Sequence, residues 1–465
     1  MKLLDPGTPL SAKKISTISE KMKYSDLPDP VVEASKRFIL DLLGCILGAK
    51  HVASSKIMAQ VISNLGGSPQ STIIGYNHKT SAPMAALING TTGHAFDMDD
   101  DHREGTLHCS VVVFPAVLSV AELHSSSGKD VLTAYALGSE HMIRLGESFL
   151  GKTYYQGFHT TGTTGVFGAA LGAGKILGLS AQQLTAALGI AGSQAAGLLA
   201  FGEDGTWTKR LQAGHPAMGG VFSALLAREN YTGPGAIYDS MGGFIRAFSH
   251  KEQYDVSKVT DQFGSRWELL DNSIKPHACC RFSGPIVDCA LEISKNNDIR
   301  PDEIKDVLVY ANQWMITALT QPIERKIKPT TEVDAQFSLP YAAAIGLVKK
   351  RAFVTEFTEE ALKDPEVLKI TEKVRWELDP EFEKLYPKVY PAKIVVTMND
   401  GKQYSARVDH PKGDPENPLS DAQIIEKFQS LAVKTISQDK ADEIVDKVLN
   451  LEKLKNINEL TGCLR

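Results

Sequence analysis

Apolar residues recur every three or four positions through most of the first 265 residues of this chain. Short groups of Gly, Ser and Pro separate the periodic segments, and the strict alternation of a half-buried strand is scarce. The spacing predicts helices, because residues three and four apart share one helix face. The first clear helix begins at Asp29-Pro30, where Asp can cap it and Pro suits the first turn. Further helices are predicted over residues 82–96, 111–125, 128–149, 162–177, 180–199 and 214–229.

Gly and Ala are frequent inside these predicted helices. Small side chains let two helix backbones approach closely, so the composition predicts tight helix–helix packing. The most apolar long stretch, Thr160–Phe201, is interrupted by Gly, Ser, Gln and Lys175. It is too mixed to span a bilayer, and we expect packed core helices there rather than a membrane segment.

The pattern changes after about residue 270. Residues 304–310 have the composition of a strand, and residues 392–397 and 403–408 flank Asp400-Gly401, which is a strong hairpin signal. Ser420 and Gln423 have the spacing of a capping box at the start of a helical tail. The helices predicted in this half of the chain cover residues 337–349, 358–374, 420–431 and 439–451.

The chain is therefore predicted to be mainly α, with a smaller α+β unit inserted before a helical tail. We place the first part of a large all-helical domain at residues 1–269, the α+β domain at 270–412 and the C-terminal part of the helical domain at 413–465. A chain of 465 residues is long enough for two or three domains.

The net charge limits the possible partners, and the cysteine pattern indicates the cellular compartment. The formal net charge is -5 and no long basic stripe is present, so neither nucleic acid nor an anionic membrane is expected as a partner. Six cysteines occur without a CxxC pair or a Cys/His zinc spacing, which predicts reduced thiols in a cytoplasmic protein. Residues 1–7 lack the apolar segment of a signal peptide.

The segment from His94 to His108 concentrates residues that can move protons. It contains three histidines, one glutamate and four aspartates, which are Asp97, Asp99, Asp100 and Asp101. Apolar, Ala-rich segments flank it, unlike a solvated acidic tail. Histidine titrates near neutral pH, and neighbouring carboxylates fix its tautomer or raise its pKa. The segment is therefore a candidate site for proton transfer.

A series of short motifs runs along nearly the whole chain in a specific order and spacing. The motifs are Val31–Gly44, His94-Ala-Phe-Asp-Met-Asp-Asp100, Gly157-Phe-His159, Gly205-Thr-Trp-Thr-Lys-Arg-Leu211, Lys275-Pro-His-Ala-Cys-Cys-Arg281 and Val333-Asp-Ala-Gln-Phe-Ser338. Together they resemble the MmgE/PrpD family, which includes 2-methylcitrate dehydratase, cis-aconitate decarboxylase and iminodisuccinate epimerase. The resemblance implies a helical domain built from both chain ends, a smaller α+β lid and a homodimer.

The resemblance also implies a chemistry that uses no metal and no cofactor. Family members act on small di- and tricarboxylates by proton transfer, with loss of water or carbon dioxide or with epimerisation. The positions that match the family's active site are Asp97, His108, His159 and Lys209. We expect His108 to donate or accept the proton, and Lys209 and His159 to bind the substrate carboxylate and stabilise the enolate. Asp97 would orient a histidine or hold a substrate hydroxyl.

Other residues are secondary candidates for contact with the substrate. Arg210, His277 and Arg281 suit carboxylates by residue type, and the last two would reach in from the lid. The family often has Thr after its paired aspartates, where this chain has Asp101 before His102, and often has His where this chain has Gln212. The complete set of predicted substrate-binding residues is Asp101, His102, Tyr155, Arg210, His277 and Arg281, with Tyr154 as a further candidate phenol.

The leading hypothesis is a lyase most similar to 2-methylcitrate dehydratase. Decarboxylation of cis-aconitate and epimerisation of iminodisuccinate are the enzymatic alternatives, because all three reactions share a carbanion-like intermediate. A helical dimer that binds a carboxylate without turning it over is the alternative outside enzymes.

Simpler explanations also exist for the same residues. The aspartates could form a solvated helix terminus or a divalent-metal site, and His108 could be a core histidine. Lys209-Arg210 could be surface charge. Cys279-Cys280 is predicted to serve packing, and His94 to pack between helices rather than to take part in catalysis.

Overall fold

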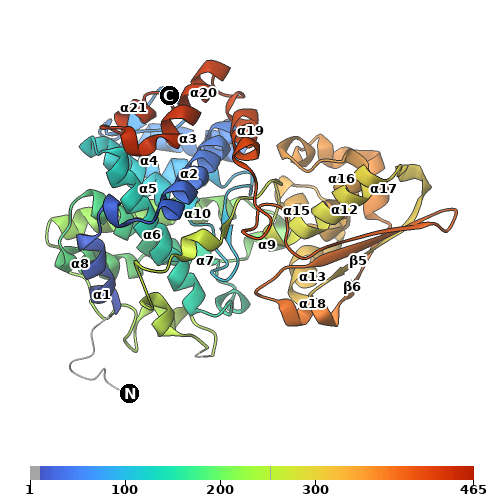
Figure 1. The fold of residues 1–465 in the computed structure, drawn as a ribbon, viewed down its shortest axis with the longest axis horizontal. Helices are drawn as coiled ribbons and strands as arrows, with labels where there is room; N and C mark the ends of the chain where they lie inside the picture. The colour runs from blue at the N-terminus through green and yellow to red at the C-terminus, as the bar shows by residue number, and fades with distance from the viewer. Residues whose placement is uncertain (1–10, 252) are drawn as a thin grey trace.

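The computed structural model describes residues 11–251 and 253–465, so the predicted absence of a signal peptide at residues 1–7 lies outside the described residues. The described chain is mainly α-helical, as predicted, with a helical body and a smaller α+β part beside it (Figure 1). The helices of the body are α1 (Ser11–Lys21), α2 (Asp29–Ala49), α3 (Ala53–Leu65), α4 (Ala82–Gly93), α5 (Ser110–His124), α6 (Gly128–Ser148), α7 (Thr160–Ile176), α8 (Ala181–Gly192), α9 (Phe201–Asp204), α10 (Thr208–Arg228), α11 (Phe244–Phe248), α19 (Asp421–Ala432), α20 (Gln438–Leu449) and α21 (Asn458–Thr461).

The helices of the body cross at glycines, as the composition predicts. A Cβ on Gly90 of α4 would lie 2.9 Å from the Cα of Gly214 on α10. A Cβ on Gly214 would lie 2.1 Å from the backbone oxygen of Leu87. Real Cβ atoms do not approach backbone so closely, so glycine at both positions lets α4 and α10 pack backbone against backbone.

Two predicted helices have different boundaries in the structure. The helix predicted over 180–199 ends at Gly192, and residues 193–200 form a loop in which Gly197 has a φ of +145°. The helix predicted to begin at residue 214 begins at Thr208. Gly214 suggested a helix start because glycine weakens helices, whereas it lies inside α10 at the contact with α4. The longer α10 includes Lys209 in its first turn.

The end of the chain packs against its beginning. Ser420 caps α19 through a capping box with Gln423, as predicted. A Cβ on Gly44 of α2 would lie 3.0 Å from the Cα of Phe428 on α19, so these two helices are also in close contact. In Figure 1 the C-terminal helices α19 and α20, drawn in red, lie beside the blue α2.

The α+β part contains a four-stranded sheet in the order β6-β5-β7-β8. Strands β5 and β6 are parallel, whereas β5–β7 and β7–β8 are antiparallel. Along β7, Ala392, Ile394, Val396 and Met398 are buried and alternate with more exposed residues, as expected for a sheet covered on one face. The strands are β5 (Ile304–Ala311), β6 (Val374–Leu378), β7 (Ala392–Met398) and β8 (Gln403–Val408), and the helices are α12 (Gly284–Asn296), α13 (Gln313–Thr320), α14 (Ile323–Ile327), α15 (Glu332–Gln336), α16 (Leu339–Lys349), α17 (Pro365–Thr371) and α18 (Pro380–Leu385).

The predicted strand at 304–310 and the predicted hairpin are confirmed, but the helix predicted over 358–374 is wrong. That segment contains the short helix α17, which Asp364 caps, and it ends where β6 begins at Val374. The β6 edge strand has only one fully buried residue, so its sequence lacks a clear strand pattern.

Two further short pairings shape the body. Strands β1 (Ser71–Thr72) and β2 (Lys79–Thr80) form one of them. Strand β3 (Asp101–His102) pairs with β4 (Asn272–Ser273), which joins the acidic segment to the chain that enters the α+β part. Among the described residues no single helix combines the length and apolarity needed to cross a membrane; α2 and α3 meet these criteria only as a pair, which bends by 87°.

Candidate active site

A cavity of about 280 Å³ lies between the helical body and the α+β part. The acidic segment contributes Asp97, Asp101 and His108 to its wall, and α10 contributes Lys209. Arg281 lines it from the chain that enters the α+β part. The rest of the wall includes the aromatic residues Tyr154, Phe201, Phe282, Trp314, Phe337 and Tyr390.

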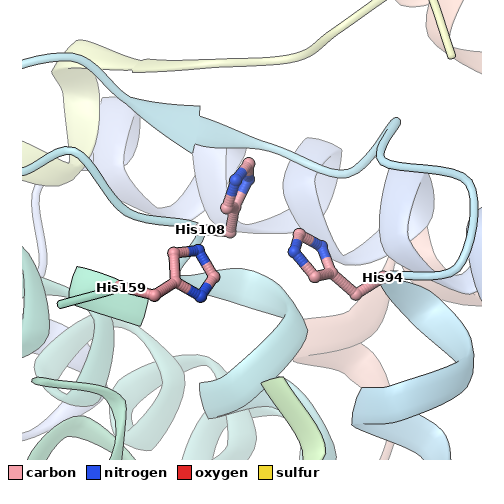
Figure 2. Close-up of side chains that lie close together, drawn as sticks. All are labelled: His94, His108 and His159. Atoms are coloured by element: carbon pink, nitrogen blue, oxygen red, sulfur yellow. The ribbon is translucent and has the colours of Figure 1, made fainter. Parts of the chain in front are cut away.

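Three histidines from separate segments lie close together (Figure 2), and His108 is the one that lines the cavity. His94 follows α4, His108 comes just before α5 and His159 directly precedes α7. The ring centroids of His94 and His108 are 4.6 Å apart, and each lies 6.3 Å from that of His159. All three side chains are buried.

The contacts of these histidines fix their tautomers. Nδ1 of His94 lies 2.8 Å from a carboxylate oxygen of Asp99. Nδ1 of His108 lies 2.8 Å from the backbone oxygen of Asp100, and Nδ1 of His159 lies 2.8 Å from Oε1 of Gln212. Each acceptor requires a proton on Nδ1, so each Nε2 carries a lone pair.

Asp97 lies between two lysines at the base of the site. Its carboxylate accepts a hydrogen bond from Lys209 Nζ at 2.8 Å and another from Lys275 Nζ at 2.7 Å. Lys209 Nζ also donates to Nε2 of His94 at 2.9 Å. Burial alone would raise the pKa of Asp97, but the two lysines hold this pKa well below its usual range. The carboxylate is therefore ionised and orients both ammonium groups.

The histidines are neutral at neutral pH. Burial lowers the pKa of His108 well below its usual value, and the nearby charge of Lys209 lowers it further, against the opposing effect of Asp99. Burial and Lys209 likewise lower the pKa of His159. A neutral imidazole whose Nδ1 proton is held in place can accept a proton at Nε2. His108 lines the cavity and is therefore in position to do so.

Asp100 fixes the backbone of the acidic segment. It accepts hydrogen bonds from the backbone N–H of Ser110, from the thiol of Cys109 and from the side-chain amide of Asn272. Burial raises the pKa of Asp100 to about 7, and the charge of Asp99 adds to this effect. These contacts make Asp100 a structural residue behind His108.

The predicted secondary residues are not all brought to the cavity. Arg210 pairs with Glu332 at 2.7 Å, and His277 pairs with Asp288 at 2.8 Å; neither lines the cavity. His102 is buried, and its Nδ1 accepts the N–H of Gly105 at 3.0 Å. Tyr155 is about half exposed and packs against Trp314, whereas Tyr154 lines the cavity.

Two groups of described side chains could supply metal ligands at this site: His94, His108 and His159, and the overlapping group His94, Asp97, Asp99 and His108. The Lys209 ammonium already contacts Nε2 of His94, so a metal ion here would compete with a cation that Asp97 holds. A third group, His410, Asp414 and Glu416, is neutralised by two arginines, Arg103 and Arg281.

Two residues of the site, His94 and Lys275, are missing from the sequence prediction. His94, expected to serve packing, hydrogen-bonds with Asp99 and Lys209 instead. Lys275 lies far from Asp97 in the sequence and reaches it through the β3–β4 pairing. Both residues lie in the family-like motifs, at the first position of His94–Asp100 and of Lys275–Arg281, and this position is the sequence signal for them.

Comparison with known proteins identifies the family of the chain. The N-terminal domain model of the MmgE/PrpD family matches residues 13–257, and its C-terminal domain model matches residues 277–453. The chain belongs to this family.

Individual relatives indicate which kind of enzyme in this family the chain is similar to. A cis-aconitate decarboxylase-like protein of Aspergillus oryzae is 30% identical over 99% of this chain and 98% of its own length. The cis-aconitate decarboxylase of Aspergillus terreus is 30% identical over 96% of this chain and 94% of its own length. The human cis-aconitate decarboxylase is 30% identical over 97% of this chain and 94% of its own length. The chain is thus a lyase of the MmgE/PrpD family.

Proposed function

We propose that this lyase acts on a small di- or tricarboxylate, with His108 transferring a proton at the carbon next to a carboxylate. The observation that supports the proposal best is the neutral His108, with its free Nε2, in the wall of a cavity that also contains the Lys209 ammonium. Proton removal or loss of carbon dioxide leaves negative charge on the substrate, and a fixed cation beside that charge lowers the barrier. Asp97 holds Lys209 in position for this role.

Decarboxylation is the reaction that the relatives support. The bond between the substrate and its departing carboxylate breaks, and the electron pair stays on the substrate, shared with a neighbouring double bond and carboxylate. A protonated histidine then delivers the proton to carbon. The negative charge of the bound substrate would raise the pKa of His108 and allow it to carry that proton.

Dehydration of a 2-methylcitrate-like acid is the second candidate, and the resting state of His108 favours it. The neutral imidazole removes a proton from the carbon next to a carboxylate. The resulting imidazolium returns this proton to the hydroxyl group on the neighbouring carbon, which leaves as water while the electron pair of the broken C–H bond forms the double bond. Asp97 or Asp101 would hold that hydroxyl, since both line the cavity.

We further propose that the α+β part acts as a lid and that the protein is a cytoplasmic homodimer. The cavity supports the proposal of a lid, because its wall combines residues of both parts.

Exposed apolar side chains support the proposal of a dimer. Leu211 and Phe222 lie on one face of α10, with Trp207 and Leu198 near its start. Light scattering after gel filtration tests the dimer, and Leu211→Glu/Phe222→Glu should yield monomers.

The first experiment is proton NMR of the EDTA-treated protein in deuterium oxide with 2-methylcitrate, citrate, cis-aconitate and iminodisuccinate. An alkene from 2-methylcitrate or citrate identifies a dehydratase, itaconate identifies a decarboxylase, and deuterium incorporation with inversion identifies an epimerase. Binding of these acids without any change in their spectra would instead support a carboxylate-binding protein.

A further inference from the structure

Asp101 places an acceptor in the cavity wall. Its backbone is held by the pairing of β3 with Ser273 of β4, and its side chain is buried. Oδ1 of Asp101 is enclosed, and Nη1 of Arg281 lies 3.2 Å from it. Oδ2 is not among the enclosed atoms, and no described residue donates a well-formed hydrogen bond to it. Because Asp101 lines the cavity, Oδ2 is the oxygen suited to accept a hydrogen bond from a bound molecule.

Arg281, the cation beside it, already has two carboxylate partners. Its Nη2 lies 2.5 Å from Asp414, in addition to its contact with Asp101. Its guanidinium also lies over the ring of Tyr390, 5.5 Å from the centroid. Asp414 also lies 3.4 Å from Arg103, which pairs in turn with Glu416 at 2.7 Å. This cluster contains three carboxylates and two guanidinium groups, so it has no spare positive charge for a carboxylate of the substrate.

The surroundings of Lys209 are less acidic. Lys209 and Lys275 both pair with Asp97, and the charge of Asp99 also acts on Lys275, so two ammonium groups balance two carboxylates there. A substrate carboxylate is therefore stabilised beside Lys209 and repelled beside Asp101. We propose that the substrate carries a hydroxyl or amino group that donates a hydrogen bond to Asp101, and that no third carboxylate binds at this end of the cavity. This assignment rests on the proposed function and, among its substrates, favours acids with a hydroxyl or amino group over acids without such a donor.

The test compares acids that differ in one group. Calorimetry at about pH 8 would measure the binding of malate, aspartate, succinate and tricarballylate, which present a hydroxyl, an ammonium, neither donor, and a third carboxylate. We expect malate or aspartate to bind at least about tenfold more tightly than succinate, and tricarballylate to bind no better than succinate. Malate and aspartate distinguish a hydroxyl from an amino donor.

Variants assign the preference to Asp101. Asp101→Thr should remove the preference and strengthen tricarballylate binding about tenfold, because Arg281 becomes available. Asp101→Asn has nearly the same shape and should also gain tricarballylate binding, which guards against a folding defect in the first variant. Glu416→Gln removes a carboxylate from the same cluster outside the cavity and should behave like the wild type.

Equal binding of malate, aspartate and succinate would overturn the assignment, as would no binding of any donor-bearing acid or an unchanged preference in both Asp101 variants. Deuterium exchange at carbon in the same samples reports the proton transfer separately. Selective binding without deuterium exchange or product would contradict the proposed function and leave the role of Asp101 intact. Turnover of acids that lack a hydroxyl or amino donor would contradict the role of Asp101 and leave the proposed function intact.

Discussion

Replacing Asp97 by Asn tests how strongly one buried carboxylate holds the two active-site lysines. Asp97 has a φ of +50°, a left-handed conformation that Asn adopts as readily as Asp, so the substitution adds no backbone strain. It also conserves the side-chain volume. Asp97→Asn therefore removes a charge and little else.

The expected loss follows from the two contacts, at 2.8 Å to Lys209 and 2.7 Å to Lys275. Each pair has a Coulomb energy of about 6 kcal/mol at an effective dielectric constant of ~20. Most of this energy offsets the desolvation of the charges. Removing one partner of a buried pair nevertheless costs about 3–5 kcal/mol, because the remaining charge is left uncompensated. We expect a loss in this range for Asp97→Asn.

The assay is urea unfolding of the wild type, Asp97→Asn and a control, Glu372→Gln. Glu372 lies 2.9 Å from Lys328, but both side chains are more than half exposed. The control should lose less than about 1 kcal/mol.

The pH dependence follows from the lowered pKa of Asp97. The contribution of Asp97 to the free energy of unfolding is complete above the unfolded pKa of about 4 and is lost only as pH falls through the folded pKa. The difference should therefore stay constant between about pH 6 and pH 8. A loss as small as that of the control would refute the electrostatic argument.

His108→Asn should lower turnover by about 10² or more with an unchanged urea midpoint, because it removes the proton-transferring group; near-normal NMR rates would exclude His108 from the chemistry. Gly214→Ala should destabilise the protein by about 1–3 kcal/mol in urea, since the new Cβ meets the backbone of α4, whereas Gly242→Ala, with no atom nearby, should be neutral. The pKa of Asp100 is raised to about 7 in the folded protein, so protonation of Asp100 favours the folded state. Its contribution to the free energy of unfolding is complete below about pH 4 and is lost as pH rises through about 7. Between about pH 5 and pH 8 the wild type should lose about 2 kcal/mol relative to Asp100→Asn; parallel pH profiles would contradict this linkage.

Local sequence patterns were sufficient for most of the fold. Capping at Ser420, the Asp400-Gly401 turn and the helical periodicity act over a few residues, and the structure agrees with them. The predicted boundaries of helices and strands are wrong where a contact with a residue distant in the sequence determines the local conformation. Gly214 lies within a helix because α4 packs against it, and β6 is a strand because it pairs with β5.

The same limit applies to the site. The motifs suggested His108, His159, Asp97 and Lys209 separately. The structure places His108, Asp97 and Lys209 in the wall of one cavity, with His159 behind them, 6.3 Å from His108 between ring centroids. The sequence could not show that Lys275 shares Asp97 with Lys209, because folding brings these residues together over a long separation. Nor could it distinguish Arg281, which lines the cavity, from Arg210, which pairs elsewhere.

The packing of the last helices against α2 has a consequence for synthesis on the ribosome. The hydroxyl of Thr435 donates a hydrogen bond to the backbone oxygen of Leu47, a contact between residues 388 positions apart. At about 5–20 residues per second, α2 waits roughly 20–80 s for this partner. Until then part of its apolar surface stays uncovered, and a chain that stops before α19 never covers it. The helical body is therefore the last part of the protein to complete its fold, although its first helices are made first.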